Sequence, residues 1–358
     1  MNRVPSANAE SSFAESGSVV DMSVMPQTSA PVAVAGEPAQ SRGARVVRRH
    51  GWTVGVYILT VVLALYWSTL PVRFNAFTLQ SLFLAALPLA LAGMAQSVVI
   101  ISGGIDLSVG SMMSLINVLS AKYMMNHGMG TALALSLGLI IAGGFGGALT
   151  GAMITFFRVP DIVVTLAMLF FWGGLALQIM PQPGGGAPLQ FQNFATGAIG
   201  GGWIPNAAIV LVIVLLVAWV PIRWRRPGLA LYALGSNRNS TFLSGIGVAR
   251  TRIGAYALGG ALAAVAGLSL TATAGSGNAT GGDYYTLQSV GAAVLGGVAL
   301  TGGKGGMIGP IAAAFILALV DSIIVLLGIN GNYGQIIQGA LIVVVVMLAS
   351  VLTKGRRR

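Results

Sequence analysis

Long apolar runs follow one another along the chain from residue 53 onward, separated by short polar or glycine-rich stretches. A helix needs about 20 apolar residues to cross the roughly 30 Å of hydrocarbon in a bilayer. Runs of this kind predict about ten transmembrane helices. The predicted fold class is therefore all-α, a polytopic transmembrane helical bundle with broken glycine-rich segments. The predicted spans are 53–70, 79–101, 107–125, 131–157, 161–180, 204–222, 253–273, 286–300, 307–328 and 335–353.

The first 45 residues show neither a helical nor a strand period and are rich in Ser, Ala, Pro and Gly. They contain four of the eight acidic residues of the chain. Segments with so little apolar surface cannot offset the entropy of folding. We therefore predict a disordered cytoplasmic tail at 1–45 and a transmembrane domain at 46–358. A cleaved secretory signal is not indicated, because no short apolar core follows the first basic residue.

Basic residues flank the apolar runs and do not cover one face of a soluble domain, although the net charge is +11. They precede the first span, fill the loop 223–252 and end the chain. Because Lys and Arg gather in short cytoplasmic loops, this pattern predicts that both termini and that loop are cytoplasmic. The loops 181–203 and 328–334 contain no Lys or Arg and fall outside. Arg73 and Lys122 are exceptions, and no nucleic-acid partner is indicated.

Composition argues against most enzymatic chemistries. The chain is 55% hydrophobic and 8% charged, which is more apolar surface than one soluble core needs to bury. It has no Cys and two His, so thiolate sites and zinc clusters are not expected. The stretch 301–306 fails the phosphate-loop pattern, because Val298 stands at its first glycine position and Gly305 follows Lys304. We expect no catalytic residue, no metal and no cofactor in this chain.

Two glycine-rich stretches of similar sequence lie in opposite halves of the chain, at 103–110 and 296–303. Paired glycine-interrupted segments are typical of transport sites, because broken helices expose backbone dipoles to a polar solute. Chance similarity between glycine-rich membrane sequences is the alternative, and the sequence leaves both open. The candidate residues for translocation or gating are Gly103, Gly104, Asp106, Ser108, Gly296, Gly297, Gly302 and Gly303.

The four acidic residues beyond the tail lie in or beside apolar segments, where a carboxylate normally faces a partner, a cavity or water. Asp106 precedes a span and is either a helix cap or part of a pathway. Asp161 follows Pro160 at a helix start and is expected to be a cap. Asp283 closes a polar stretch that is either a docking point for a delivery protein or a flexible surface loop. Asp321 lies mid-span and is expected to hydrogen-bond to a neighbouring helix.

Four ordered motifs together carry a specific family resemblance. They are Gly103-Gly104-Ile105-Asp106-Leu107-Ser108-Val109-Gly110-Ser111, Pro160-Asp161-Ile162-Val163-Val164-Thr165-Leu166-Ala167-Met168, Ala233-Leu234-Gly235-Ser236-Asn237 with Ser244-Gly245-Ile246, and Val294-Leu295-Gly296-Gly297 with Leu300-Thr301-Gly302-Gly303-Lys304-Gly305. Over roughly residues 75–352 the chain resembles the ribose-type permeases of ABC importers, a family that includes more distant branched-chain amino-acid permeases.

The resemblance implies a multi-pass protein of the bacterial inner membrane in which two copies, or this chain and a close paralogue, line a translocation path. It also implies cytoplasmic ATPase subunits that hold ATP and magnesium, and a periplasmic solute-binding protein. Asp283 is the candidate docking residue for that protein, because the predicted topology places it outside. In the family a short helix of the cytoplasmic loop contacts the ATPase and moves as a lever, which agrees with the placement of 223–252 inside. The residues of this chain that resemble that segment are Gly235, Asn237, Ser244, Gly245 and Ile246.

The sequence departs from the family pattern at two places. Ser240 and Thr241 stand where the family usually has two alanines, within the stretch expected to contact the ATPase. Thr286 and Gln288 replace acidic residues that are common before the second Gly-Gly motif. A pathway poor in charge and rich in Gly, Ser, Thr, Asn and Gln favours a neutral hydrophilic solute, and the resemblance indicates a monosaccharide.

An ion-coupled secondary transporter is the alternative function. It needs a membrane-embedded acid to titrate or to ligate an ion, and Asp106 or Asp321 is available for that role. The long basic loop with its 237–246 motif has no use in such a protein, so the importer is the leading hypothesis.

Overall fold

The computed structural model describes residues 42–70 and 74–354. Residues 1–41, which make up most of the predicted tail, lie outside this part of the chain, so the tail stays a prediction. Arg73, an exception to the predicted charge pattern, also lies outside it. Within the described residues, contacts group the chain from Arg49 onward into one compact unit.

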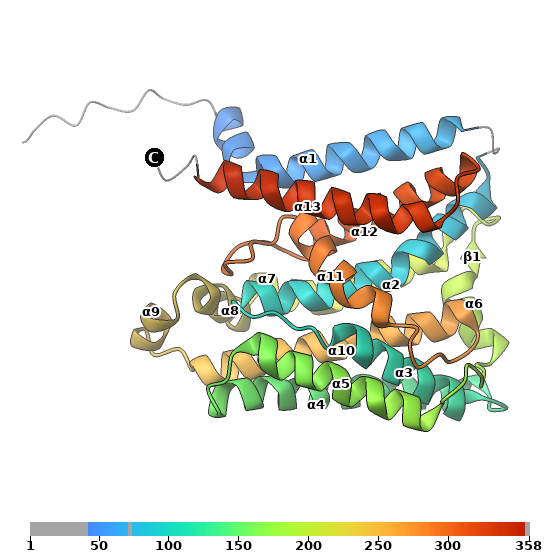
Figure 1. Cartoon of the computed structure of the whole chain (residues 1–358), viewed down its shortest axis with the longest axis horizontal. Coiled ribbons are helices and arrows are strands. Elements are labelled where there is room, and N and C mark those ends of the chain that lie inside the picture. The colour runs from blue at the N-terminus through green and yellow to red at the C-terminus, as the bar shows by residue number, and fades with distance from the viewer. Residues whose placement is uncertain (1–41, 71–73, 355–358) are drawn as a thin grey trace, which may run out of the picture. The chain divides into compact units, whose positions relative to one another are not determined.

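The described chain is almost wholly helical, and its long helices lie roughly parallel or antiparallel to one another (Figure 1). A small antiparallel hairpin joins β1 (Ala198–Ile199) to β2 (Ile204–Pro205), with Ala198 opposite Pro205. The helices are α1 (Arg42–Thr69), α2 (Ala76–Ile101), α3 (Val109–Met124), α4 (Met129–Phe156), α5 (Asp161–Ile179), α6 (Leu189–Thr196), α7 (Asn206–Trp224), α8 (Arg226–Ser236), α9 (Arg238–Leu243), α10 (Val248–Ala274), α11 (Asp283–Leu295), α12 (Ile308–Leu326) and α13 (Asn332–Lys354).

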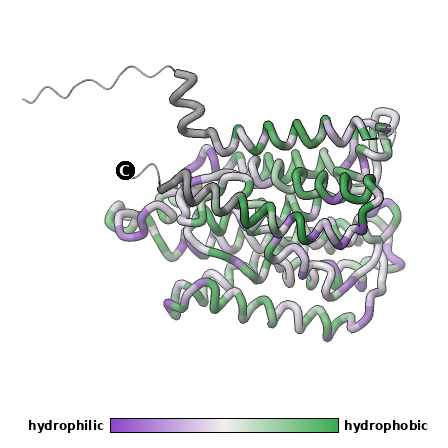
Figure 2. Tube along the Cα trace, turned by 45° about the horizontal axis from the view of Figure 1, so that its top comes forward, coloured by the Kyte–Doolittle hydropathy of each residue, from purple (hydrophilic) through white to green (hydrophobic). Residues whose placement is uncertain are grey.

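Every predicted span overlaps a helix, which confirms the predicted bundle. Within the described residues, seven helices are long and apolar enough to cross a membrane: the Trp52–Thr69 part of α1, and α2, α4, α5, α7, α10 and α12. Hydrophobic residues follow these helices, and hydrophilic residues gather in the joining loops (Figure 2). Helices α3 and α11 have only 16 and 13 residues. At about 1.5 Å per residue each is shorter than the hydrocarbon core, so a crossing there needs the adjoining loop.

Helices α2 and α10 form the centre of the bundle. The apolar stretch of α2 is 89% buried inside the protein and that of α10 is 61% buried, whereas that of α1 is only 11% buried. Helix α10 packs most extensively on α4, where a Cβ on Gly147 would overlap the carbonyl of Tyr256 and one on Gly143 would lie 2.7 Å from that of Gly260. Small residues at such positions let membrane helices approach closely. Helix α2 continues through Pro88, so the first Gly-Gly pair lies at its end.

The basic loop 223–252 is a folded segment. After α7 ends, α8 begins with Pro227 in its first turn, a position that proline favours. Helix α9 follows at once, and the side chain of Asn237 caps it by accepting from the N–H of Ser240 at 3.0 Å. Helix α10 starts directly after the turn that ends α9. The segment therefore connects two membrane-crossing helices through short, defined turns.

Candidate functional site

The first Gly-Gly motif forms the end of α2. The N–H of Gly104 donates to the carbonyl of Val99 at 3.0 Å, and the N–H of Gly103 donates to that of Ile100 at 2.9 Å. This is a Schellman motif, in which the residue just past the helix takes a left-handed conformation. Gly103 has φ = +86°, which side chains with a Cβ rarely adopt, so glycine is required there.

Helix α11 ends in the same way. The N–H of Gly297 donates to Val294 at 2.9 Å, the following N–H donates to Ala293 at 3.0 Å, and Gly297 has φ = +89°. Gly297 is therefore the structural counterpart of Gly103. The sequence similarity had paired Gly103 with Gly296, which is one residue out of register. The two loops match as helix endings.

Three glycine-containing segments that are far apart in the sequence meet at one backbone junction. The N–H of Gly303 donates to the carbonyl of Ile101 at 2.9 Å. A Cβ on Gly235 would overlap that same carbonyl, and one on Gly302 would lie 2.9 Å from the Cα of Gly103. We call these five residues the glycine junction. It joins the end of α2, the end of α8 and the α11–α12 loop without intervening side chains.

Gly296 and Gly297 lie apart from the glycine junction. A Cβ on Gly296 would overlap the backbone of Gly309. The contact between Gly296 and Gly309 therefore sets how closely the start of α12 approaches the end of α11. Trp52 of α1 donates its indole N–H to the carbonyl of Leu295 at 3.0 Å. The second Gly-Gly motif is thus split between two tasks, close packing at its start and contact with the other loops at its end.

Asp106 organises the loop between α2 and α3. The residue is only 3% exposed. Its Oδ1 accepts from the N–H of Ser108 at 2.8 Å and from its hydroxyl at 2.6 Å. Gln96, in the amide orientation that satisfies both of its ends, donates to the backbone carbonyl of Asp106 at 3.0 Å and accepts from its N–H at 3.2 Å. The N-cap residue of α3 is Ser108, and Asp106 bonds to this residue and not to the free N–H groups of the helix, so the contacts form a local turn before α3 and do not show the expected helix cap. A role in a pathway stays a prediction.

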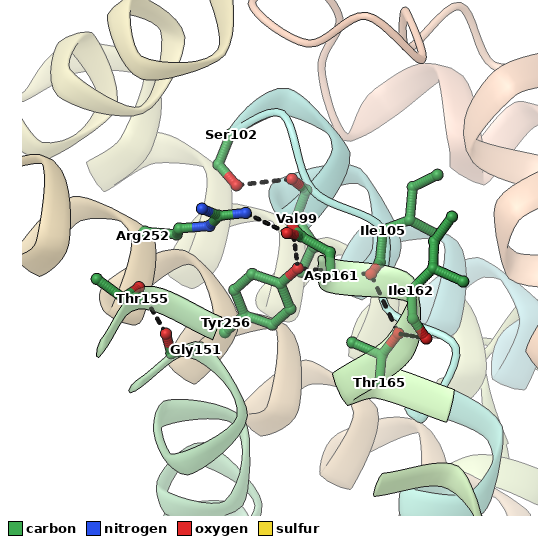
Figure 3. Close-up of polar contacts among 10 residues, drawn as sticks. All are labelled: Val99, Ser102, Ile105, Gly151, Thr155, Asp161, Ile162, Thr165, Arg252 and Tyr256. Atoms are coloured by element: carbon green, nitrogen blue, oxygen red, sulfur yellow. Dashed lines mark hydrogen bonds and ion pairs between the residues drawn. The ribbon is translucent and has the colours of Figure 1, made fainter. Parts of the chain in front are cut away.

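The prediction that the side chain of Asp161 caps α5 is wrong. The N-cap position of α5 is Pro160, and the carboxylate of Asp161 is directed to α10. Its Oδ1 accepts from the guanidinium of Arg252, and its Oδ2 accepts from the hydroxyl of Tyr256 at 2.7 Å (Figure 3). A Cβ on Gly104 would lie 2.7 Å from that Oδ2. One carboxylate is therefore shared by α5, α10 and the first glycine loop. The sequence separation of Asp161 and Arg252 left no local signal for this pair.

The residues expected to contact an ATPase form a tight exposed turn around α9. Gly245 ends this helix with φ = +75°, and the N–H of Ile246 donates to the carbonyl of Thr241 at 3.3 Å. The hydroxyl of Ser244 donates back to α9, and Asn237 caps its other end. The structure thus brings the predicted segment together at the surface, whereas Gly235 lies behind it in the glycine junction.

Sequence reasoning missed two exposed residues of α9. Phe242 is 71% and Leu243 83% exposed. Adjacent large apolar residues in a polar, basic loop were the signal that could have found them. Ser240 and Thr241, the residues that depart from the family pattern in this segment, differ in exposure. Ser240 is exposed, whereas Thr241 is buried and donates its hydroxyl to the carbonyl of Asn237 at 2.7 Å. Of these two residues, only Ser240 is therefore accessible at the surface.

Asp283 is exposed at the first residue of α11. The polar stretch before it is anchored to α3. Asn117 donates to the carbonyl of Ser276 at 3.0 Å and accepts from the N–H of Asn278 at 2.7 Å. This anchoring does not fit the alternative of a flexible surface loop. Docking at Asp283 stays a prediction.

A buried polar stripe along α3 also escaped sequence reasoning. The N–H of Gly282 donates to the hydroxyl of Ser114 at 2.8 Å, and Asn117 donates to the hydroxyl of Thr271 at 2.9 Å. Polar groups inside a membrane protein need such partners. A polar residue at every third position of an otherwise apolar span was the visible signal. The stripe consists of Ser108, Ser111, Ser114, Asn117 and Ser120.

The two departures before the second Gly-Gly motif take part in helix packing. Thr286 fits against Gly110, where a Cβ would overlap its hydroxyl oxygen. Gln288 is buried and donates to the side-chain oxygen of Gln338 at 2.9 Å, and the same oxygen accepts from Tyr284 at 2.6 Å. These polar residues link α11 to α3 and to α13.

A cavity of about 340 Å³ opens beside the 223–252 segment, between α2, α7, α8 and α10. Arg250 and Thr251 contribute its polar part, and most of its lining is apolar. Such a lining offers few hydrogen-bond partners to a polar solute, so we do not assign the solute to it. The lining residues are Val98, Ile222, Pro227, Leu231, Arg250, Thr251, Gly254, Ala255 and Leu258.

Most of the chain is similar in sequence to known proteins. A family described as branched-chain amino acid transport system / permease component matches residues 78–346. The chain is 33% identical over 304 residues to the ribose import permease protein RbsC of Escherichia coli (strain K12), covering 81% of this chain and 91% of that protein. It is 32% identical over 306 residues to RbsC of Bacillus subtilis (strain 168), covering 85% and 93%. It is 29% identical over 300 residues to the D-allose transport system permease protein AlsC of Escherichia coli (strain K12), covering 83% and 91%. No solved structure matches the chain significantly.

The matched region contains the whole candidate site. Both glycine loops, the glycine junction and the α9 segment lie within residues 78–346. The seven long apolar helices agree with a multi-pass membrane protein. The chain therefore belongs to the branched-chain amino acid transport system / permease component family.

Proposed function

We propose that the chain is the permease subunit of an ATP-binding cassette importer that moves a small neutral hydrophilic solute, a monosaccharide, across the inner membrane. The glycine junction carries this proposal. Through it, the segment that leads into exposed α9 contacts both the α2–α3 loop and the α11–α12 loop. A movement of α9 therefore reaches both loops by backbone contact. The relatives named for ribose and D-allose support a monosaccharide.

The cytoplasmic ATPase docks on α9 in this proposal. Phe242 and Leu243 offer it two exposed apolar side chains. Beside them, a Cβ on Gly245 would meet nothing within 4 Å, so the turn is open to a partner. Closure of the ATPase around nucleotide would then displace α9 as a lever. ATP and magnesium belong to that subunit, and catalysis takes place there.

The periplasmic binding protein docks on the opposite face, near Asp283. Helix α10 starts directly after the α9 turn and ends before the loop that leads to Asp283. Its 27 residues span about 40 Å, enough to separate the two docking points by a bilayer. The basic 223–252 segment then faces the cytoplasm, as do both termini. A second permease copy completes the path.

In this proposal the gating residues lie in the two glycine loops. Gly103, Gly104, Asp106 and Ser108 belong to the first loop, and the second contributes Gly296, Gly297, Gly302 and Gly303. No observation favours an ion-coupled transporter. Asp106 is engaged by Ser108, and Asp321 lies against Gly334 of α13, where a Cβ would overlap its carboxylate.

Reconstitution into liposomes with the cognate ATPase and binding protein tests the function. We expect uptake of a labelled sugar that needs ATP inside and stops with vanadate. Ribose, allose and fructose are compared with leucine, which is expected to stay outside. Accumulation by the lone chain under an ion gradient, without ATPase, would contradict the proposal.

Gly245→Arg tests the docking of the ATPase at α9. The bulk and charge block the open turn, so we expect uptake to fall at least about tenfold while the chain still inserts in the membrane. Gly245→Ala is the matched control, because it carries the same strain at φ = +75° without the bulk. Normal uptake in Gly245→Arg would remove α9 as the docking site.

A further inference from the structure

Asp161, Arg252 and Tyr256 form a polar cluster beside Ile105 of the first glycine loop (Figure 3). Helix α10 begins at Val248, directly after the α9 turn. Arg252 therefore lies about one turn into α10, and Tyr256 follows four residues later on the same face. Both reach across to Asp161, the first residue of α5.

The cluster also contacts the first glycine loop. The hydroxyl of Tyr256 lies 3.4 Å from the carbonyl of Ile105, and the hydroxyl of Thr165 lies at the same distance from it. A Cβ on Gly104 would lie 2.6 Å from the Tyr256 hydroxyl, closer than real Cβ contacts come. The loop therefore rests directly on the cluster at two consecutive residues, and glycine at 104 is what permits the approach.

The ion pair is sheltered, and the carboxylate of Asp161 gives Oδ1 to Arg252 and Oδ2 to the hydroxyl of Tyr256. Tyr256 is fully buried, and the side chains of Arg252 and Asp161 are 14% and 15% exposed. Among the described residues this is the only ion pair. Removing one partner of a sheltered pair leaves the other charge without compensation, so the pair holds α5 and α10 in one fixed arrangement.

We propose that the Asp161–Arg252–Tyr256 cluster is a latch that transmits displacement of the α9–α10 turn to the first glycine loop. Arg252 and Tyr256 act as positioning residues, and they move the loop through Asp161, Gly104 and Ile105. The α11–α12 loop receives the same movement through the glycine junction. The latch rests on the proposed function, because it requires a partner that displaces α9.

The test measures uptake and ATP hydrolysis in parallel in the reconstituted importer. Arg252→Gln and Asp161→Asn each break the ion pair, and we expect uptake to fall at least about tenfold while hydrolysis stays within about twofold. The double variant removes both charges and is expected to be no worse than either single one, because the two residues act as a unit. Tyr256→Phe keeps the ion pair and lowers uptake by about threefold.

Arg250→Gln is the matched control on the same helix, because Arg250 is exposed and the structure assigns it no ion pair among the described residues. It is expected to leave the ratio of uptake to hydrolysis unchanged. The same unchanged ratio in Arg252→Gln and Tyr256→Phe would overturn the latch. If Arg252→Gln fails to assemble, Tyr256→Phe decides alone. Failure of the unsubstituted chain to take up any sugar would instead refute the proposed function, so the two failures are distinct.

Discussion

The loops that follow α2 and α11 begin alike and are held differently. Each starts with a Schellman motif around a left-handed glycine, Gly103 at φ = +86° and Gly297 at φ = +89°. The first loop is then held by polar side chains, with Asp106 bonded to Ser108 and the Asp161 cluster beneath it. The second is held mainly by backbone packing at glycine positions.

This difference separates two ways of fixing an irregular segment inside a membrane protein. Polar anchors in low-dielectric surroundings are directional, and losing one partner leaves the other group buried without a bond. Close backbone contacts need the absence of a side chain. The first loop should therefore respond to the loss of polar groups as well as to added volume at Gly104, and the second mainly to added volume.

Gly296→Ala should have the largest effect on stability. The added Cβ would overlap the backbone of Gly309, so we expect the free energy of unfolding to fall by about 3 kcal/mol. Ser102 is the equivalent helix-end residue of α2, and Ser102→Ala loses only a 2.7 Å bond to Val99, about 1 kcal/mol. Unfolding in mixed detergent micelles, followed by Trp fluorescence, measures both. Equal losses would show that the two helix ends are held alike.

Asp106→Ala should come next. It leaves the N–H and the hydroxyl of Ser108 without their shared acceptor, so we expect a loss of about 2 kcal/mol. Leu300 stands at the corresponding position of the second loop and is 45% exposed, so Leu300→Ala should change stability by less than about 0.5 kcal/mol. Hydrogen exchange at residue 108 gives an independent readout. A larger effect at Leu300 would reverse the comparison.

The sequence predicted the helices well because apolar runs of membrane length are nearly sufficient to place them. It overestimated the lengths of α3 and α11, because their flanking loops are apolar or glycine-rich and continue the hydrophobic pattern. At 286–300 the predicted span runs past the actual helix end at Leu295. The left-handed conformation at Gly297 ends that helix, and hydropathy does not report backbone dihedral angles.

The candidate site was predicted only in parts. The sequence motifs named most members of the glycine junction, but their meeting depends on tertiary packing of segments from α2, α8 and α11. The pairing of Asp161 with Arg252 also depends on how α5 lies against α10, so a carboxylate at a helix start was assigned the more common role of a cap. The stripe on α3 had a local signal in its spacing of three.

Gly103→Ala and Gly297→Ala probe what the two loops share. Both residues have a left-handed backbone, so each substitution should cost about 1.5 kcal/mol, and the two costs should agree within about 0.5 kcal/mol. The Gly297 variant brings its methyl group near Trp52, whereas at Gly103 the nearest atom is the Cα of Gly235 at 3.6 Å. Micelle unfolding again provides the measurement. A clear difference would mean that the surroundings, and not the helix ending, set the cost.

Trp52→Phe is the mildest change and shows whether the two anchors are independent. It removes the indole bond to Leu295, so we expect a loss of about 1 kcal/mol or less, confined to the second loop. In double-mutant cycles it should add to Asp106→Ala within about 0.5 kcal/mol, because they act on different loops, and should couple with Gly297→Ala, whose added Cβ would lie 3.2 Å from the indole ring. Coupling between Trp52→Phe and Asp106→Ala would instead mean that the glycine junction makes both loops one energetic unit, held together by backbone contact despite their different anchors.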